Sequence, residues 1–554
     1  MCGIFGGFNI DKNTSQKAIE LINRGDDGIT VEKMDGNLFF AARRHLVKKS
    51  GNDEKSKSDQ PYFSNDKNMA LIFNGEFYNF EDYKKKLKSS DSSFMSSGDT
   101  EVLLRLFEKK GIDFLKDKKI DSLFAIAIYD KKNKLITIAR DWPGRIPLYY
   151  YHDSERFIFS SELKAFKAIK NLSLQKPIEL TPGTYVQYSL ETKKIEIIRY
   201  FTPNNSLIKK NENIMDIGSK IHNLLDESAR NRTMGDVPIC TMLSGGIDSV
   251  LTTFYVFKNL NFKKIGYKPK SFVFSIEGYD SIDVKRARVA AESFKEIDLE
   301  LVEVTSSSEN LIENVPNIIE SFEMRKMKAL SFYPLPIYWY LAPKMRDYGF
   351  KVTIGGHGVD ELLGAYDSWK ELNKGHEVQI QSKSRMAFIN NIYNNMLKRA
   401  SIIFMNRGPI EARFPFLNQN VCEYLLSIDK KWLQINKENC EILLRLIDEK
   451  QNENLGKVKK NLIKYYDDKF SDEEKNNEEY KNLEKIFWKF PLLVSSYIAS
   501  KNSFLKFDQV FNPKHRGQHG AGITSLEKDI VKYYKNLGRD DTEIFRNIAN
   551  EKFK

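Results

Sequence analysis

The sequence predicts two successive domains: an antiparallel α+β layered domain over residues 2–200, and an α/β domain with a parallel sheet and a helical C-terminal part over residues 216–554. Three observations predict this. At 554 residues the chain is too long for one ordinary core. Short strand-like runs fill the first 200 residues, and strand-like and helix-like segments alternate from residue 217 to residue 354. The polar residues 201–215 are the expected linker.

The first domain is expected to be built mainly from short strands. The turn KKNK (131–134) links two of them as a hairpin. Helical spacing of apolar residues occurs in 15–24 and 99–111. The expected strands are 3–10, 38–42, 70–77, 123–130, 135–141, 147–151, 157–161 and 185–189. Many short strands with two helices are typical of an antiparallel layer domain.

The second domain alternates strands with helices. Strands are expected at 237–243, 271–276, 299–305 and 351–354, and helices at 217–232, 249–258, 283–295 and much of 334–347. The strands are apolar throughout, which favours a parallel sheet that is covered on both faces. Beyond about residue 365 the sequence is mostly helical in pattern.

Composition excludes several classes of protein. The four cysteines, Cys2, Cys240, Cys422 and Cys440, form neither a CxxC pair nor a Cys/His cluster, so we expect no disulfide framework and no structural metal site. No apolar stretch reaches the roughly 18 residues of a membrane span, and no signal-like segment opens the chain. We therefore expect a cytoplasmic protein with no membrane partner.

The net charge of +12 raises the question of a nucleic-acid partner. The 87 basic residues are interspersed with 75 acidic ones, and runs such as KKKLK (84–88) are typical of solvated faces. No recognisable nucleic-acid motif accompanies the charge. We therefore expect no nucleic-acid partner.

The chain opens MCGIFGGF, with Cys2 directly behind the initiator Met. A cysteine there is a buried small hydrophobic residue, a disulfide partner, or a nucleophile that carries its own base. Its immediate neighbours do not distinguish these roles.

The segment LSGGIDS (243–249) ends an apolar strand and starts a helix. Backbone N–H groups in such a turn make an anion site that suits a pyrophosphate. The segment resembles the pyrophosphatase loop of N-type ATP pyrophosphatases, which cleave ATP between the α and β phosphates. Asp248 is then expected to hold Mg²⁺. A second glycine loop, GGHGVDELLGAY (355–366), follows another parallel strand, and Asp360 is its natural second carboxylate for Mg²⁺.

These two loops are part of a longer series of motifs. In order along the chain the motifs are MCGIFG, RGDDG, NGEFYN, SGDTEV, RDWPGRIPLYY, SSELKA, LSGGIDS, GGHGVDE and EARFPFL. This order resembles the asparagine synthase-like family, which includes glutamine-hydrolysing asparagine synthetases. The match runs from residue 2 to about 420, with a weaker echo at 512–523. The fold that it implies is an αββα sandwich of the Ntn amidotransferase type, joined to an α/β ATP-pyrophosphatase domain.

The resemblance implies a glutaminase site in the first domain. Once Met1 is removed, Cys2 carries a free α-amine, whose pKa of roughly 7.7–8.0 suits a base near neutral pH. By resemblance, the Asn74 side chain and the Gly75 backbone stabilise the oxyanion. Asp99 pairs with the α-amino group of glutamine. Arg44, His45, Asn74, Glu76 and Asp99 are the expected glutamine-binding residues.

The resemblance implies a synthetase site in the second domain, which ammonia reaches through an internal tunnel. ATP and Mg²⁺ adenylate a carboxylate there, aspartate in the family, and ammonia displaces AMP. The expected ATP-binding residues are Leu243, Ser244, Gly245, Gly246, Asp248, Ser249, Phe274, Gly355, Gly356 and Lys514. The expected residues around the acceptor are Asp283, His357, Asp360, Glu361 and Arg413, and Asp248 and Asp360 are the expected Mg²⁺ ligands. A homodimer is compatible with the resemblance.

The chain departs from the family pattern at four places. His45, in ARRHL, stands where the family has Arg, and a shift by one residue lets Arg44 hold the glutamine carboxylate. His357 replaces an acid, and Asn418 replaces the Asp of PFLD. Lys514 falls where the family has a phosphate-binding lysine, but a surface lysine is the alternative.

For two further residues the sequence leaves two roles open. Arg413 either positions a substrate carboxylate or braces a turn. Asp283 caps its helix, contacts the substrate, or does both.

The leading hypothesis is a glutamine-dependent asparagine synthetase, which makes asparagine, AMP, pyrophosphate and glutamate. The first alternative keeps the architecture and amidates another carboxylate, that of a sugar, a peptide or a secondary-metabolite precursor; His357 and Asn418 favour it. An enzyme that uses free ammonia, a binding protein without turnover and a nucleic-acid-binding accessory complete the alternatives.

Overall fold

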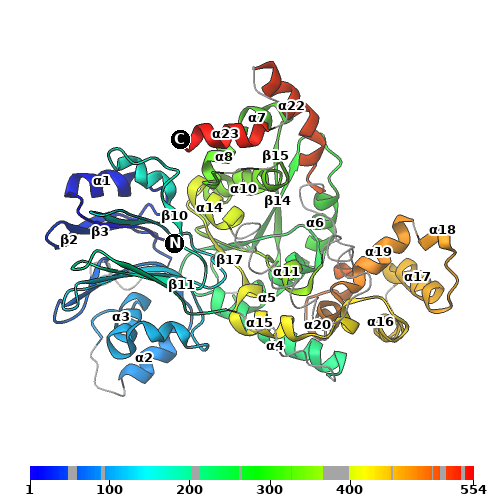
Figure 1. Cartoon of the computed structure of the whole chain (residues 1–554). Coiled ribbons are helices and arrows are strands. Elements are labelled where there is room, and N and C mark those ends of the chain that lie inside the picture. The colour runs from blue at the N-terminus through cyan, green and yellow to red at the C-terminus, as the bar shows by residue number, and fades with distance from the viewer. Residues whose placement is uncertain are drawn as a thin grey trace.

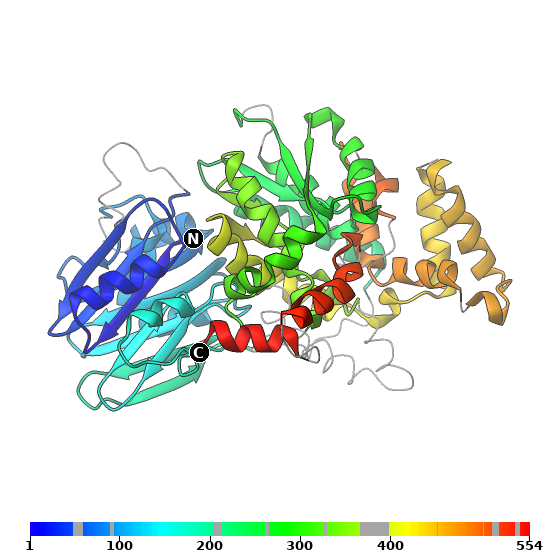
Figure 2. The same cartoon turned by 90° about the horizontal axis from the view of Figure 1, so that it is seen from above.

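The structure is a computed structural model of the chain. It describes residues 1–47, 59–88, 94–202, 212–260, 265–325, 327, 329–365, 398–450, 453–475, 477–501, 503–511, 520–537 and 543–554. Two domains lie side by side, the first with two stacked sheets and the second with a single central sheet (Figure 1). A group of helices within residues 437–487 projects from the second domain on the side away from the first (Figure 2).

The first domain contains two six-stranded sheets, in which every strand pair is antiparallel. The first sheet has the order β10(Ile178–Glu179), β8(Tyr149–His152), β9(Phe157–Ser160), β1(Gly3–Phe8), β3(Leu38–Arg43), β2(Ile29–Asp35). The second has the order β12(Ile195–Arg199), β11(Thr184–Ser189), β7(Leu135–Arg140), β6(Ser122–Asp130), β5(Met69–Phe77), β4(Tyr62–Phe63). The KKNK hairpin joins β6 to β7, as predicted.

The two sheets enclose an apolar core, to which Ile4 and Phe40 contribute from one sheet and Ile72 and Ile138 from the other. The outer faces are covered by helices: α1(Lys12–Leu21) and the 3₁₀ helix η2(Leu163–Ala168) on the first sheet, and α2(Phe80–Lys88) and α3(Asp99–Lys110) on the second. The domain is therefore an αββα sandwich, as predicted.

The strands that the sequence pattern missed in this domain lie mostly at sheet edges. β2 reads ITVEKMD and β12 reads IEIIR, and both are largely exposed or half-buried. An edge strand with charged side chains faces water on more than one side, so it lacks the apolar run that marks a central strand. α2, in the Lys-rich run FEDYKKKLK, was also missed.

The second domain is built on a five-stranded sheet in which every pair is parallel. Its order is β15(Glu300–Ser306), β14(Lys270–Ile276), β13(Ile239–Met242), β16(Val352–Ile354), β17(Glu411–Arg413). Its helices up to residue 365 are α4(Ile214–Arg232), α5(Ile247–Asn259), α6(Ile282–Glu292), α7(Ser308–Glu313), α8(Val315–Phe322), α9(Ala329–Phe332), α10(Leu335–Asp347) and α11(Val359–Leu363). The predicted parallel sheet is confirmed, and β17, only three residues long and two of them charged, is the strand that the pattern missed.

The C-terminal part is helical, as predicted. Its helices are α14(Lys398–Arg407), α15(Gln419–Ser427), α16(Lys437–Glu449), α17(Gly456–Tyr466), α18(Asp472–Lys475), α19(Glu478–Phe487), α20(Phe490–Ala499), α22(Glu527–Asn536) and α23(Ile544–Lys552). None of the helices in the described ranges is long and apolar enough to cross a membrane. Cys240, Cys422 and Cys440 are buried free thiols, as expected of small core residues.

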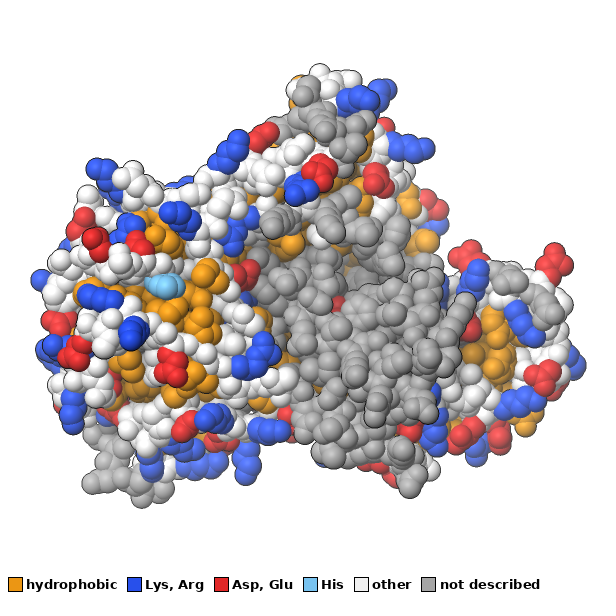
Figure 3. Space-filling view, viewed as in Figure 1, with side chains coloured by type: hydrophobic (Ala, Val, Ile, Leu, Met, Phe, Trp, Pro, Cys, Tyr) orange, Lys and Arg blue, Asp and Glu red, His pale blue; other side chains and the backbone are white. Residues whose placement is uncertain are grey.

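Charged side chains of both signs are mixed over the first domain on the face that Figure 3 shows. In the run KKKLK, Lys85, Lys86 and Lys88 are exposed, as interpreted, whereas Lys84 is buried and donates to the carbonyl oxygen of Ser96 at 2.9 Å.

Polar contacts and the chain terminus join the two domains. Asp121 of the first domain forms an ion pair with the buried Arg232 of α4 at 3.0 Å. Glu323, directly after α8, accepts hydrogen bonds from the backbone N–H groups of Leu163 at 2.9 Å and Lys164 at 3.3 Å. Phe553, directly after α23, is buried in the core beneath the first sheet, so α23 brings the last residues back to the first domain (Figure 2).

The buried carboxyl of Glu323 makes this interface sensitive to pH. Burial and the neighbouring Glu162 raise its pKa to about 7, although Lys164 and the two backbone donors oppose the shift. Between about pH 4.3, the usual pKa of a Glu side chain, and pH 7, the folded protein therefore keeps a proton on Glu323 that the unfolded chain releases. The resulting stability is present at acidic pH and is lost as the pH rises through 7.

We predict that the melting temperature decreases from pH 6 to pH 8 and that Glu323→Gln decreases it less, since the amide does not ionise. Thermal melts followed by circular dichroism at the two pH values measure this. The exposed Glu309 lies in the same domain, and Glu309→Gln is expected to keep the wild-type slope. An unchanged slope in Glu323→Gln contradicts the assignment.

Candidate functional site

Cys2 lies directly before β1, at the boundary between the two domains. Its side chain is partly exposed. Burial raises the pKa of its thiol, and the Met1 amine, the backbone N–H of His45 and Arg44 act in the opposite direction. Because burial dominates, the thiol is protonated near neutral pH and needs a base before it can act as a nucleophile.

Asn74 and Gly75 lie on β5, which faces β1 across the core. The buried Asn74 donates from Nδ2 to the Ser161 hydroxyl at 3.1 Å, and the same hydroxyl accepts from the Ile4 backbone N–H at 3.0 Å. Ser161 therefore ties the predicted oxyanion residue to the strand that follows Cys2. Asn74 Oδ1 is buried and has no hydrogen-bond partner within the described chain.

Gly75 allows a close approach between two strands. A Cβ atom at this position would lie 2.0 Å from the carbonyl oxygen of Leu123 on the paired strand β6. No side chain fits there.

Asp99 and Glu76 lie close enough for their charges to interact. Asp99 is the first residue of α3, and its Oδ2 accepts from the backbone N–H of Phe77 at 3.0 Å. Burial, Glu411 and Asp99 raise the pKa of Glu76 well above its usual range, although Arg413 opposes them. Both predicted acids therefore belong to one cluster of interacting charges near Cys2.

Arg44 and His45, the two candidates for binding the carboxylate of glutamine, lie in different surroundings. The His45 ring is buried against the second domain, with Nε2 3.3 Å from the carbonyl oxygen of Lys351. Burial and the Met1 amine lower its pKa to about 3, so the ring is neutral. Arg44 acts electrostatically on the Cys2 thiol and forms an ion pair with Asp59. Arg44, not His45, supplies a cation beside the thiol.

A buried ion network connects the Cys2 region to β17. The Met1 amine lies 2.7 Å from Glu411 Oε2, Arg413 Nε lies 2.7 Å from Glu411 Oε1, and Arg413 Nη2 lies 3.7 Å from Glu76. Arg413 is fully buried and also donates to the carbonyl oxygen of Arg232 at 2.7 Å. Arg413 braces the domain boundary and does not line the cavity of the second domain.

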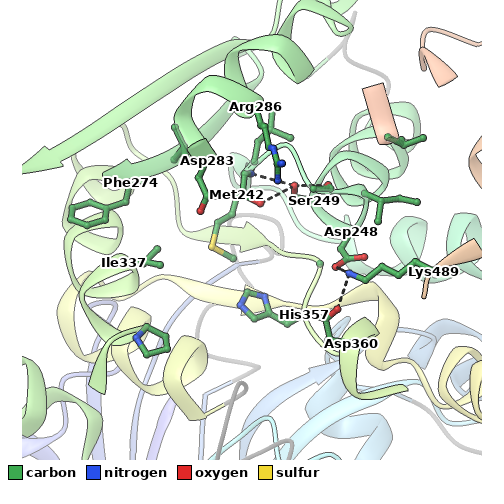
Figure 4. Close-up of a pocket in the computed structure, with 18 of the residues that line it drawn as sticks. Met242, Asp248, Ser249, Phe274, Asp283, Arg286, Ile337, His357, Asp360 and Lys489 are labelled. Atoms are coloured by element: carbon green, nitrogen blue, oxygen red, sulfur yellow. Dashed lines mark hydrogen bonds and ion pairs between the residues drawn. The ribbon is translucent and has the colours of Figure 1, made fainter. Parts of the chain in front are cut away.

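That cavity, of about 270 Å³, lies at the carboxyl ends of β13, β14 and β16 (Figure 4). The predicted site residues that line it are Leu243, Ser244, Gly246, Asp248, Ser249, Phe274, Asp283, Gly356, His357 and Asp360. Gly245 and Gly355 belong to the two loops, whereas Glu361 is buried in α11 and is not among the residues that line the cavity. Lys514 lies outside the described residues.

The SGG loop is shaped by close backbone approaches. Gly245 has φ +75°, and a Cβ there would lie 2.5 Å from Arg286. A Cβ on Gly356 would lie 2.6 Å from the carbonyl oxygen of Asp248, so the second glycine loop closes against the first. The Ser249 hydroxyl donates to the carbonyl oxygen of Gly246 at 2.9 Å and accepts from the Ser244 N–H at 3.2 Å.

The predicted metal ligands Asp248 and Asp360 meet at Lys489, a residue that the sequence pattern did not single out. Lys489 Nζ forms ion pairs with Asp248 and, at 2.8 Å, with Asp360 (Figure 4). Burial opposes its charge, but the two carboxylates raise the pKa of Lys489 above its usual range. Because a single cationic nitrogen contacts both carboxylates, the pair fits a single divalent cation.

Asp283 faces the cavity from the first turn of α6. Ser281 is the N-cap of that helix, with its hydroxyl accepting from the Val284 N–H at 3.1 Å, so Asp283 is not the capping residue. Burial raises the pKa of Asp283 to about 7, although Arg286 opposes the shift. Asp283 is therefore a buried acid that titrates near neutral pH.

His357 and Asn418, two departures from the family pattern, occupy different environments. His357 lines the cavity, and its Nε2 lies 2.9 Å from the Tyr338 hydroxyl. Asn418 is the N-cap of α15, where its Oδ1 accepts from the Asn420 N–H at 2.9 Å. His357 can therefore contact a ligand in the cavity, whereas Asn418 stabilises the start of α15.

The aromatic end of the cavity is opposite its charged end. Phe274 and Ile337 lie on the far side from Lys489 in Figure 4. The Phe274 ring stacks on Tyr340 with a centroid distance of 5.2 Å and an interplanar angle of 3°. An elongated ligand with an apolar ring at one end and anionic groups at the other fits this arrangement.

We predict that Gly75→Ala destabilises the protein by about 2 kcal/mol or more, because the new methyl group collides with the backbone of β6. Urea unfolding measures the loss. Gly456→Ala is the matched control, since a Cβ at Gly456 meets no atom within 4 Å. Equal stabilities of the two variants contradict the close approach.

Two family models match the chain: "Glutamine amidotransferase domain" over residues 1–216 and "Asparagine synthase" over residues 220–398. A probable glutamine-hydrolyzing asparagine synthetase of Dictyostelium discoideum is 27% identical over 451 residues, which cover 77% of this chain and 76% of that protein. Asparagine synthetase B of Escherichia coli is 25% identical over 446 residues, covering 77% and 75%.

Among solved structures, the glutamine phosphoribosylpyrophosphate amidotransferase of B. subtilis, complexed with ADP and GMP, is 19% identical, with a TM-score of 0.30, and the match covers 47% of this chain and 64% of that one. The family models, in contrast, span most of the chain in the order of its two sites. The chain therefore belongs to the asparagine synthase family, as a glutamine amidotransferase domain followed by an asparagine synthase domain.

Proposed function

We propose that the protein is a glutamine-dependent asparagine synthetase, which hydrolyses glutamine at Cys2 and uses ATP to convert aspartate into asparagine. The observation that carries the proposal is the meeting of Asp248 and Asp360 at one cationic nitrogen beside the SGG loop. The two carboxylates support a reaction of a nucleoside triphosphate in the same chain as the Cys2 site. The names of the similar proteins support aspartate as the acceptor.

The glutaminase half begins with removal of Met1. Met1 is 1% exposed and its amine pairs with Glu411 of the second domain, so an aminopeptidase reaches it only before the domains dock. The freed α-amine of Cys2 then takes the thiol proton, and the sulfur attacks the carboxamide carbon of glutamine. Asn74 and the Gly75 N–H stabilise the oxyanion. The C–N bond breaks, ammonia leaves with the proton, and water hydrolyses the thioester to glutamate.

The synthetase half uses the cavity of the second domain. The backbone N–H groups of the SGG loop and the α5 N-terminus bind the phosphates of ATP. Asp248 and Asp360 are the residues that would hold Mg²⁺, whose charge offsets that of the pyrophosphate leaving group. The aspartate side-chain carboxylate attacks the α-phosphorus, pyrophosphate leaves, and ammonia from the first domain, delivered along an internal route, displaces AMP to form the amide.

A second candidate keeps both half-reactions and changes the acceptor carboxylate. The observation that favours it is His357, an imidazole hydrogen-bonded to Tyr338 at a position where the family resemblance leads us to expect an acid. Asn418 gives this candidate no support, since it caps α15.

Product analysis decides between the two acceptors. The full chain is incubated with ATP, Mg²⁺, glutamine and either aspartate or one of a panel of other carboxylic acids, and AMP, pyrophosphate and amide are measured. We expect aspartate to stimulate pyrophosphate release and asparagine to accumulate. Pyrophosphate release with another acid and not with aspartate selects the second candidate.

We predict that Cys2→Ala abolishes amide formation from glutamine and preserves it with ammonium chloride, because the synthetase cavity is built from other residues. Asparagine is quantified with each nitrogen donor. Asp360→Asn is the reciprocal variant, expected to lose synthesis with both donors and to keep glutamine hydrolysis. Loss of ammonia-dependent synthesis in a well-folded Cys2→Ala variant refutes this division.

A further inference from the structure

Lys489 occupies an unusual position between two helices. It lies in the short break between α19 and α20, and is the N-cap residue of α20. Its carbonyl oxygen accepts from the backbone N–H groups of Leu492 at 2.9 Å and Leu493 at 3.1 Å. α20 in turn packs against α4. The backbone of Lys489 is thus anchored in the core, and its side chain alone reaches the cavity.

The ammonium group of Lys489 holds two carboxylates that come from separate loops. Asp248 is the second residue of α5, after the SGG loop, and Asp360 is the second residue of α11, after the second glycine loop. Two carboxylates that share one partner repel each other when that partner is removed, most strongly in a site shielded from water. Lys489 is 7% exposed, so this cation is a built part of the site.

We infer that Lys489 is a positioning residue: it keeps Asp248 and Asp360 together as a pair, and releases them to a divalent cation only when the phosphates of a nucleotide offer its ammonium group another partner. The inference rests on the proposed use of ATP and a divalent cation in this cavity. Its consequence is that cation binding and nucleotide binding are coupled, each strengthening the other through the same side chain.

The charges explain why the coupling requires the nucleotide. A divalent cation alone must displace the ammonium group from both carboxylates, which leaves a buried positive charge without a partner. Phosphate oxygens accept hydrogen bonds from that ammonium group, and this removes the free-energy cost of burying its charge without a partner. Lys485 lines the same cavity, one turn earlier, and adds positive charge for the phosphates without forming the bridge described for Lys489.

The experiment measures the affinity of the full chain for Mn²⁺ alone, from the electron paramagnetic resonance signal of free Mn²⁺, and then with an ATP analogue that has a methylene group between the α and β phosphates. In wild type, Mn²⁺ alone binds weakly and the analogue tightens it. Lys489→Met, which keeps the length of the side chain and removes its charge, is expected to bind Mn²⁺ alone roughly tenfold more tightly and to lose most of the enhancement by the analogue.

Three control variants make the result specific. Lys485→Met also removes a cation from the cavity but is expected to tighten the binding of Mn²⁺ alone much less than Lys489→Met, because the two carboxylates still share the ammonium group of Lys489. Lys489→Arg restores the cation and with it the weak binding. Asp360→Asn in the Lys489→Met background loses the gain, because one ligand is missing. Circular dichroism and thermal melts show that each variant is folded.

An affinity of Lys489→Met for Mn²⁺ alone that equals or falls below that of wild type overturns the inference, as does the absence of any Mn²⁺ binding to this variant. The titration involves neither an acceptor nor turnover. The titration gives its result even if no asparagine is made. A failure of the Lys489 inference and a failure of the proposed function are therefore distinguishable.

Discussion

The buried ion network around Arg413 is the interaction on which the arrangement of both sites depends. Arg413 ends β17 and is fully buried, so its charge requires partners, and Glu411 at the other end of the same strand is the nearer of its two carboxylate partners. Glu411 also binds the amine of Met1, and Arg413 reaches Glu76 in the first domain. Breaking one member would leave a buried charge uncompensated, which is strongly destabilising.

The same short strand also leads to the second site. Arg413 pairs with Ile354 of β16, and its carbonyl oxygen accepts from the N–H of Gly355, where the second glycine loop begins. Two residues further along, His357 enters the cavity and its ring packs edge-on against Phe414. A strand of three residues therefore has the Cys2 region on one side and the cavity of the second domain on the other.

Much of the fold was predictable because its signals are local. Central strands are apolar over their full length, and the helices that cover them repeat their apolar residues at helical spacing, so both appear in the sequence without any knowledge of their partners. β2, β12 and β17 were missed for the opposite reason. Each gains its stability from a neighbouring strand or an ion pair, and its own residues include charges that resemble loop sequence.

The sequence by itself determined which residues are candidates for the chemistry: Cys2 behind Met1, Asn74 and Gly75 on one strand, and Asp248 and Asp360 after two glycine loops, because motifs preserve residue type and spacing. Only the tertiary structure decided which side chains meet. It turned His45 toward the second domain and left Arg44 beside the thiol, it used Arg413 as a brace, and it brought Lys489 from a charged helical region onto both acids. Ion pairs between residues more than a hundred positions apart depend on how the elements pack, and no local pattern records them.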